Sequence, residues 1–103
     1  MLCDASNSSA TFGFAQAVQE SGAATLIGQP TGGNRRGING GAFFFLRLPA
    51  SGLEVDLPLI ASFPSTPQPD AAILPDIAVP TTAEDIRLAR DPQMAAALHH
   101  LAA

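Results

Sequence analysis

The chain has 103 residues, of which 47% are hydrophobic and 14% charged, and its formal net charge is −4. This composition predicts one globular domain with one hydrophobic core and excludes a disordered chain. The five basic residues are all arginines and only Arg35 and Arg36 are adjacent, which argues against nucleic acid as a partner. No apolar run reaches the roughly 18 residues of a membrane span, so we expect no membrane insertion.

The first residues combine a short apolar run with a cluster of hydroxyl and amide side chains. Residues 1–4 are expected to form the end of a strand whose earlier part lies upstream, with the single cysteine, Cys3, packed at its end. The sequence Asn7-Ser8-Ser9-Ala10-Thr11 then opens a helix predicted to run to about Ser21. A hydroxyl before a helix accepts a hydrogen bond from a free amide of the first turn. Three serines can cap this helix: Ser6, Ser8 and Ser9.

The predicted helix contains a glycine and ends at another. Gly13 costs about 1 kcal/mol relative to alanine inside a helix, so we expect close packing at this position. Gly22 is a natural stop because it adopts the left-handed conformation without strain. The apolar run 24–28 is predicted to be a strand buried on both faces, so that strand, helix and strand form a parallel crossover unit. The apolar face of the helix is predicted to hold Ala10, Phe14, Ala17, Val18 and Ser21.

A glycine-rich loop at residues 29–37 follows this strand. Gly28 and Gly33 have the spacing of a phosphate-binding loop, but Asn34 and Arg35 stand where that loop requires lysine and a hydroxyl residue. Nucleotide binding is therefore rejected. The glycines are expected to let the backbone pass close to a neighbouring strand or to substrate.

The second half of the chain alternates extended segments with turns. Residues 43–48 and 53–57 predict a β-hairpin, whose turn residues lie between them. The three phenylalanines at positions 43–45 are expected to be core residues. Residues 61–72 are rich in proline and read as a surface loop, and residues 74–79 form a brief extended segment.

Two short helices are predicted at the end of the chain. Residues 81–84 have capping-box spacing, and Asp91 with Pro92 supplies a second helix start. The last helix carries Met94, Ala97, Leu98 and Leu101 on one side. Because adjacent residues of a helix point in different directions, at most one of His99 and His100 could point inward. Both are expected to face solvent near the helix end.

The serine cluster also has a chemical interpretation. A serine hydroxyl becomes a nucleophile when a base takes its proton and donors receive the charge on the attacked carbonyl oxygen. A helix start supplies such donors, because its first amides are unpaired and its dipole favours an anion. Ser9 with the amide of Ala10 fits this arrangement, although such clusters taken alone are mostly caps.

Three segments together resemble the C-terminal processing, or tail-specific, serine peptidases. The first comprises Asn7-Ser8-Ser9-Ala10-Thr11, Phe14-Ala15, Gln19-Glu20 and Gly22, and the second is Leu26-Ile27-Gly28-Gln29-Pro30-Thr31-Gly32-Gly33. The third is Leu74-Pro75-Asp76-Ile77 followed by Asp91-Pro92 and an alanine-rich helix. The resemblance implies an α/β fold of the crotonase and Clp-protease type, built from strand-strand-helix units. It also implies that residues 1–103 are the C-terminal portion of one peptidase domain whose upstream half is absent.

The resemblance assigns roles to individual residues. It makes Ser9 the nucleophile, with Ser8 as the alternative, and the Ala10 amide part of the oxyanion hole. In the processing peptidases a lysine acts as base at the position of Asn34, and an amide cannot do so. Either the base is an upstream histidine, as in relatives of the tricorn protease, or catalysis has been lost.

Two acidic residues are weaker candidates by the same resemblance. Glu20 matches an aspartate position of the processing peptidases, and Asp70 lies near an acid of the tricorn-like relatives. Their ordinary interpretations are a solvated helix residue and a loop residue.

The family resemblance implies a peptide or unfolded protein substrate, no metal or organic cofactor, and a location in the bacterial envelope. The isolated chain is expected to be inactive. A non-catalytic peptide- or apolar-ligand-binding module, as in the interphotoreceptor retinoid-binding proteins, is the alternative, with Phe43, Phe44 and Phe45 lining a pocket. A fragment without independent function is a third possibility.

Overall fold

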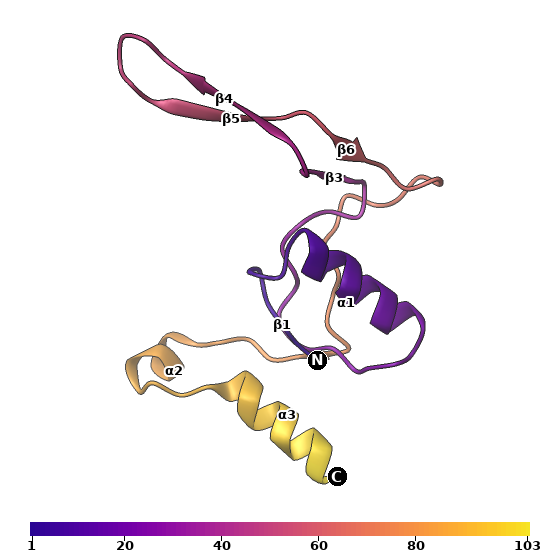
Figure 1. The fold of residues 1–103 in the computed structure, drawn as a ribbon. Helices are drawn as coiled ribbons and strands as arrows, with labels where there is room; N and C mark the ends of the chain where they lie inside the picture. Colours follow the sequence, from indigo (N-terminus) through magenta and orange to yellow (C-terminus); the bar gives the residue numbers. More distant parts are fainter. The chain divides into compact units, whose positions relative to one another are not determined.

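The computed structural model describes all residues, 1–103, and has mixed α/β structure with three small sheets and three helices. The chain divides into two compact units. The first, here called the core unit, comprises Met1–Gly33 and Ala72–Ala103, and the second, the hairpin unit, comprises Asn34–Ala71 (Figure 1).

The core unit is built on a parallel three-stranded sheet with strand order β1-β2-β7. Strand β1 (Leu2–Cys3) leads into helix α1 (Ala10–Glu20), and the chain then returns to β2 (Ile27–Gly28) beside β1. This confirms the predicted parallel crossover. Strand β2 is shorter than the predicted strand at 24–28, but both of its residues are buried as predicted, because β2 is the central strand and β7 (Ile77–Ala78) pairs with its other edge.

Helix α1 ends as its sequence predicts. Gly22 has a φ of 68°, and its amide donates to the carbonyl of Gln19. The amide of Ala23 donates to the carbonyl of Val18 at 3.0 Å. These two bonds form the reversal that satisfies the last carbonyls of a helix before a left-handed glycine.

The buried face of α1 differs from the prediction. Phe12 and Ala15 are buried, whereas Phe14 is 61% exposed. The packed side also includes Gln19, whose side-chain amide donates to the carbonyl of Leu74 at 2.9 Å. Val18 packs against the core as predicted, whereas the other residues of the predicted apolar face, Ala10, Phe14, Ala17 and Ser21, are exposed. The expected close packing at Gly13 is also wrong, because no atom lies within 4 Å of the place that a Cβ would occupy.

The hydrophobic core belongs to the core unit. Leu26 and Ile73 are completely buried, and Thr31 links the glycine-rich loop to this core. The Thr31 amide donates to the Ile73 carbonyl at 3.0 Å, and the Ile73 amide donates to the Thr31 hydroxyl at 3.1 Å. The cluster consists of Cys3, Phe12, Ala15, Leu26 and Ile73, with Met1 and Val18 packed against it.

Asp76 connects three elements of the core unit. Its carboxylate accepts the Leu26 amide at 2.7 Å and the Gln19 side chain at 3.0 Å. These bonds favour the ionised form and lower the pKa of Asp76, the Leu26 amide having the larger effect. Asp76, which directly precedes β7, therefore holds both the residue before β2 and the last turn of α1 in place.

Two helices complete the core unit. Helix α2 (Ala83–Arg87) has its capping box at Thr82 and Asp85, one residue later than predicted. Helix α3 (Pro92–Ala102) begins with proline, and the Asp91 carboxylate accepts the Met94 amide at 2.9 Å, as predicted. The apolar side chains of α3 remain largely exposed.

The hairpin unit contains two antiparallel pairs. Strand β3 (Ile38–Asn39) pairs with β6 (Ala61–Ser62), so the predicted loop at 61–72 begins with a short strand. Strands β4 (Phe43–Arg47) and β5 (Glu54–Pro58) confirm the predicted hairpin.

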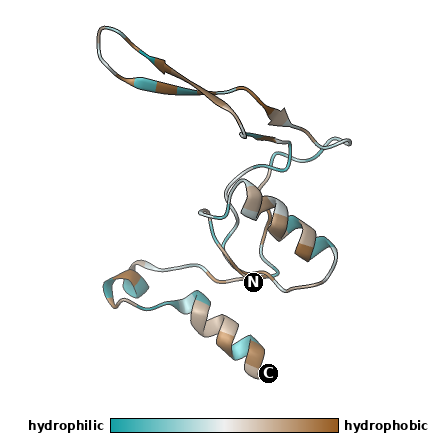
Figure 2. Cartoon of the chain, viewed as in Figure 1, coloured by the Kyte–Doolittle hydropathy of each residue, from teal (hydrophilic) through white to brown (hydrophobic).

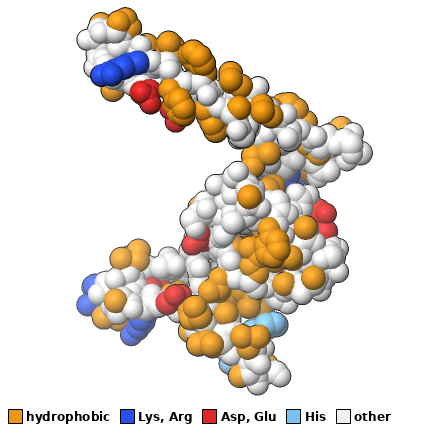
Figure 3. All heavy atoms as spheres, in the orientation of Figure 1, with side chains coloured by type: hydrophobic (Ala, Val, Ile, Leu, Met, Phe, Trp, Pro, Cys, Tyr) orange, Lys and Arg blue, Asp and Glu red, His pale blue; other side chains and the backbone are white.

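The phenylalanines of β4 are not core residues. Phe43, Phe44 and Phe45 are 46%, 59% and 58% exposed, because a two-stranded ribbon has no second layer to cover it. The ribbon of β4 is coloured mostly as hydrophobic (Figure 2), and hydrophobic side chains cover much of the hairpin surface, interrupted by charged ones (Figure 3). On one face Phe44 pairs with Leu57 and Leu46 with Val55, so this face is apolar.

We expect Leu26→Ala to lower the free energy of unfolding by about 2–5 kcal/mol, because it leaves a cavity in the core. Leu98→Ala, at an exposed position of α3, is the control and should change it by less than about 0.5 kcal/mol. Urea unfolding followed by circular dichroism measures both. Equal effects would contradict the assignment of the core.

Asp76→Asn should lower the melting temperature at pH 7, and the difference from the unchanged protein should shrink in acid. The folded pKa of Asp76 is lowered, so its contribution is complete above the unfolded pKa of about 3.9 and is lost as the pH falls through the folded pKa. Asp56→Asn, in the hairpin, is the control. Thermal unfolding measured in steps of about one pH unit from about pH 2 to about pH 7 tests this. A difference in melting temperature that stays constant over this range would refute it.

Candidate active site

Ser9 is the last residue of the connection 4–9 between β1 and α1 and has an unusual backbone conformation. Its φ is 55° and its ψ is −121°, outside the regions that a non-glycine residue normally occupies. Such a conformation costs about 1–3 kcal/mol and is typical of functional sites. A strained strand-to-helix turn is also the way in which a nucleophile elbow exposes its serine.

The predicted capping role of the serines is not observed. Ser9 occupies the N-cap position of α1, but its side chain makes no capping hydrogen bond. Ser8 contributes its carbonyl, which accepts the Thr11 amide at 3.2 Å and the Thr11 hydroxyl at 2.9 Å. The Ser9 hydroxyl therefore remains available for other chemistry.

The first turn of α1 offers a donor next to this hydroxyl. The amide of Thr11 donates to the Ser8 carbonyl, and the amide of Gly13 donates to the Ser9 carbonyl at 3.2 Å. The amide of Ala10 has no acceptor within the chain. Since the first turn of α1 carries no acidic side chain, nothing there offsets the positive end of the helix dipole. An anion beside Ser9 and Ala10 would be stabilised.

The turn before Ser9 is held by reciprocal hydrogen bonds. The Asp4 amide donates to the Asn7 side-chain oxygen at 2.9 Å, and the Asn7 amide donates to the Asp4 carbonyl at 3.0 Å. The Asp4 carboxylate accepts the hydroxyl of Ser6 at 2.5 Å and its amide at 2.8 Å. The Ser6 hydroxyl is the main cause of the lowered pKa of Asp4, which makes this carboxylate a poor proton acceptor.

The glycine-rich loop closes against the same turn. A Cβ at position 32 would overlap the Ala5 carbonyl oxygen and crowd the Cβ of Ser8. At position 28 it would overlap the Cys3 carbonyl. Only glycine permits these approaches, so the predicted close passage beside a neighbouring strand is confirmed.

Glu20 and Ser9 lie at opposite ends of α1. At 1.5 Å per residue the two are about 16 Å apart along the helix axis. The Glu20 carboxylate accepts the side-chain amide of Gln16 at 2.9 Å. The structure therefore does not bring Glu20 together with the serine.

Asn34 and Asp70 form a pair of their own. Both belong to the hairpin unit, where the Asn34 side-chain amide donates to the Asp70 carboxylate. Asp70 also forms an ion pair with Arg36 at 3.2 Å, and the Arg36 amide donates to the Asn34 side-chain oxygen at 2.9 Å. These contacts brace the two ends of the hairpin unit.

The remaining titratable residues form no metal site. No group of three or more histidine, cysteine, aspartate or glutamate side chains lies close enough together to hold a metal ion. His99 and His100 are exposed near the end of α3. Burial raises the pKa of the Cys3 thiol. None of the helices has the length and apolarity that crossing a membrane requires.

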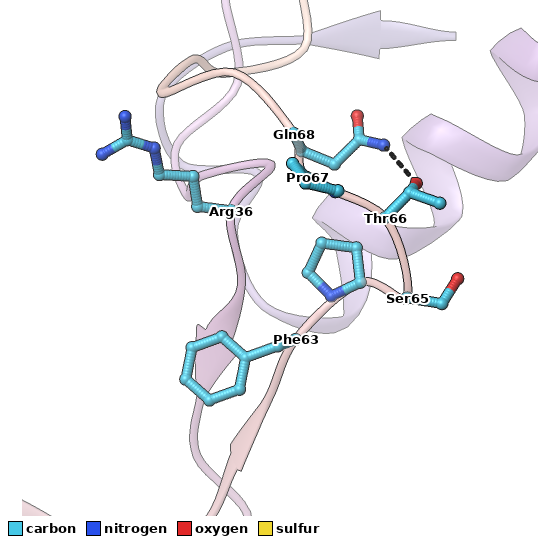
Figure 4. Close-up of a pocket in the computed structure, with 7 residues that line it drawn as sticks. Arg36, Phe63, Ser65, Thr66, Pro67 and Gln68 are labelled. Carbon is cyan, nitrogen blue, oxygen red and sulfur yellow. Dashed lines mark hydrogen bonds between the residues drawn. The ribbon is translucent and has the colours of Figure 1, made fainter.

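A depression that the sequence did not predict lies in the hairpin unit. It measures about 450 Å³ and is lined by Arg36 and residues 63–68 (Figure 4). Gln68 donates to the Thr66 hydroxyl at 3.3 Å in its wall. The run of prolines was its only signal in the sequence. Arg36 is already paired with Asp70, so the depression contains no unpaired cation.

Gly32→Ala and Gly13→Ala should have opposite effects on the stability of the fold. The first forces the glycine-rich loop away from Ala5 and should lower the free energy of unfolding by about 1–3 kcal/mol. The second adds a methyl group to an open helix position and should raise it by about 1 kcal/mol. Urea denaturation tests both, and a Gly32→Ala protein as stable as the unchanged chain would disprove the close approach.

Searches against protein-family models, curated proteins and solved structures find no match for this chain. The candidate site therefore depends on its own geometry and on the resemblance of its motifs. That geometry consists of a strained serine, an available amide donor and a turn fixed between β1 and the glycine-rich loop.

Proposed function

We propose that this chain carries the nucleophile of a serine peptidase of the C-terminal processing type, and that Ser9 is that nucleophile. The observation that carries the proposal is the strained backbone of Ser9 at the strand-to-helix turn. Its uncommitted hydroxyl supports the same conclusion, as does the Ala10 amide beside it. Ser8 is the weaker candidate because it lacks the positive φ.

The proposed reaction is acyl transfer. The Ser9 oxygen attacks a peptide carbonyl carbon, and its proton passes to a general base. The carbonyl oxygen becomes an oxyanion that accepts the Ala10 amide hydrogen. The carbon–nitrogen bond then breaks as the leaving amine takes the proton, and water releases the acyl group from Ser9.

The general base is proposed to lie outside these residues. Asn34 cannot accept the proton, and its amide is committed to Asp70. Asp4 is a poor base because Ser6 stabilises its ionised form. A histidine from upstream, as in tricorn-like relatives, would supply the function. Loss of catalysis is the other explanation of Asn34, but the strained conformation of Ser9 favours a retained nucleophile.

The same family resemblance implies that the chain is part of a larger domain. Residues 1–103 would be the C-terminal portion of a domain with the crotonase-like fold, and the upstream half of that domain would be their partner. The apolar hairpin face, with Phe44, Leu46, Val55 and Leu57 exposed, is consistent with such a partner because it lacks a covering layer. The substrate would be a peptide or an unfolded protein, and the family resemblance suggests the bacterial envelope as its location.

One observation favours the alternative, a binding module for apolar ligands or peptides. Phe43 and Phe45 lie on one face of β4 with ring centroids 6.5 Å apart, and both are exposed. Such a pair can receive an apolar ligand. This function requires no reactive serine, so a serine-directed probe separates the two proposals.

A fluorophosphonate probe should label Ser9 in the protein expressed with the upstream sequence of its gene. Ser9→Ala should abolish labelling and hydrolysis of an unfolded protein substrate, whereas Ser8→Ala, the matched control, should retain both. Activity should fall by about 10³-fold or more when the nucleophile is removed. Mass spectrometry of the labelled peptide distinguishes the two serines.

Each other result has a definite meaning. Labelling that survives Ser9→Ala and disappears with Ser8→Ala would move the nucleophile by one residue. Absence of labelling in the folded, unchanged protein would refute the peptidase proposal and leave the binding module.

A further inference from the structure

The backbone of Ser9 needs support from its surroundings. An unfavourable conformation persists only where neighbouring structure fixes it. On the helix side, Ser9 is fixed by the bond from the Gly13 amide to its carbonyl. On the strand side, the chain between Cys3 and Ser9 is a turn exposed for most of its length.

Asn7 is the residue that connects this turn to the sheet. Its side-chain oxygen accepts the Asp4 amide at 2.9 Å, and its own amide donates to the Asp4 carbonyl at 3.0 Å. The two bonds close a ring between the same two residues. Asp4 directly follows β1, so these two bonds hold Asn7, two residues before Ser9, in a fixed position relative to the strand.

We propose that Asn7 is a positioning residue for the Ser9 nucleophile, holding the turn through its reciprocal hydrogen bonds with Asp4. This inference rests on the proposed function of Ser9. Asn7 does not touch the reacting atoms. Its side-chain acceptor fixes the strand side of the turn, while Gly32 limits the space available to Ala5 and Ser8.

The role requires an acceptor of the right length and does not require an amide. Aspartate has the same shape as asparagine and keeps an oxygen toward the Asp4 amide. Alanine removes the acceptor and leaves the backbone bond alone. The pair Asn7→Asp and Asn7→Ala therefore separates the hydrogen bond from other properties of the side chain.

The rate of fluorophosphonate labelling tests the proposal. Asn7→Ala should lower the limiting labelling rate by about 10- to 100-fold, with little change in the concentration of probe that half-saturates it, because misplacement of a reacting group affects the chemical step. Asn7→Asp should restore most of the rate. Asp91→Ala is the matched control, because it removes the same kind of bond at the start of α3 and should leave labelling unchanged.

The outcomes separate this inference from the function on which it rests. No labelling of the unchanged protein would overturn the proposed function and this inference with it. Labelling of the unchanged protein together with an undiminished rate in folded Asn7→Ala would overturn the positioning role alone. Equal losses in Asn7→Asp and Asn7→Ala would do the same. If Asn7→Ala does not fold, Asn7→Ser provides a shorter acceptor, and an unchanged rate in that variant would overturn the role.

Discussion

The parallel pairing of β2 with both β1 and β7 fixes the backbone on which the candidate site is built. The pairing is close because Gly28 has no side chain, and a Cβ there would overlap the carbonyl of Cys3. The end of β1 is thereby fixed, and the turn to α1 starts from a defined point. The loop after β2 then returns past this turn at Gly32.

This arrangement explains how a short chain holds a serine in an unfavourable conformation. The strain at Ser9 is opposed by α1 on one side and by the turn bonded to Asp4 on the other. Helix α1 is itself anchored at its far end, where Gln19 bonds Leu74 and Asp76. The core side chains Phe12 and Ala15 fix its rotation. Ser9 is thus positioned by contacts at both ends of the helix.

Local patterns in the sequence predicted the crossover unit and the hairpin, because both depend on short-range periodicity and turn residues. The face of α1 that is buried could not be predicted fully in this way. Phe12 and Phe14 are equally hydrophobic, and the choice between them is made by the sheet and by the polar anchor at Gln19. The burial of Phe43, Phe44 and Phe45 was wrongly predicted for a related reason, since a strand pattern does not specify what covers the strand.

In the candidate site, too, the sequence indicated some features and not others. Ser9 and Ala10 became candidates through their place at a helix start and through the family resemblance, but no pattern encodes a positive φ at a serine, which follows from the tertiary constraints on the turn. The pairing of Asn34 with Asp70 spans 36 residues and was equally invisible.

That pairing bears on the position at which the processing peptidases, which this sequence resembles, have a lysine. An asparagine that braces Arg36 and Asp70 has a structural task where the processing peptidases use a base, so its presence does not require that catalysis was lost. The chemistry proposed for Ser9 then depends on a proton acceptor brought by another part of the protein.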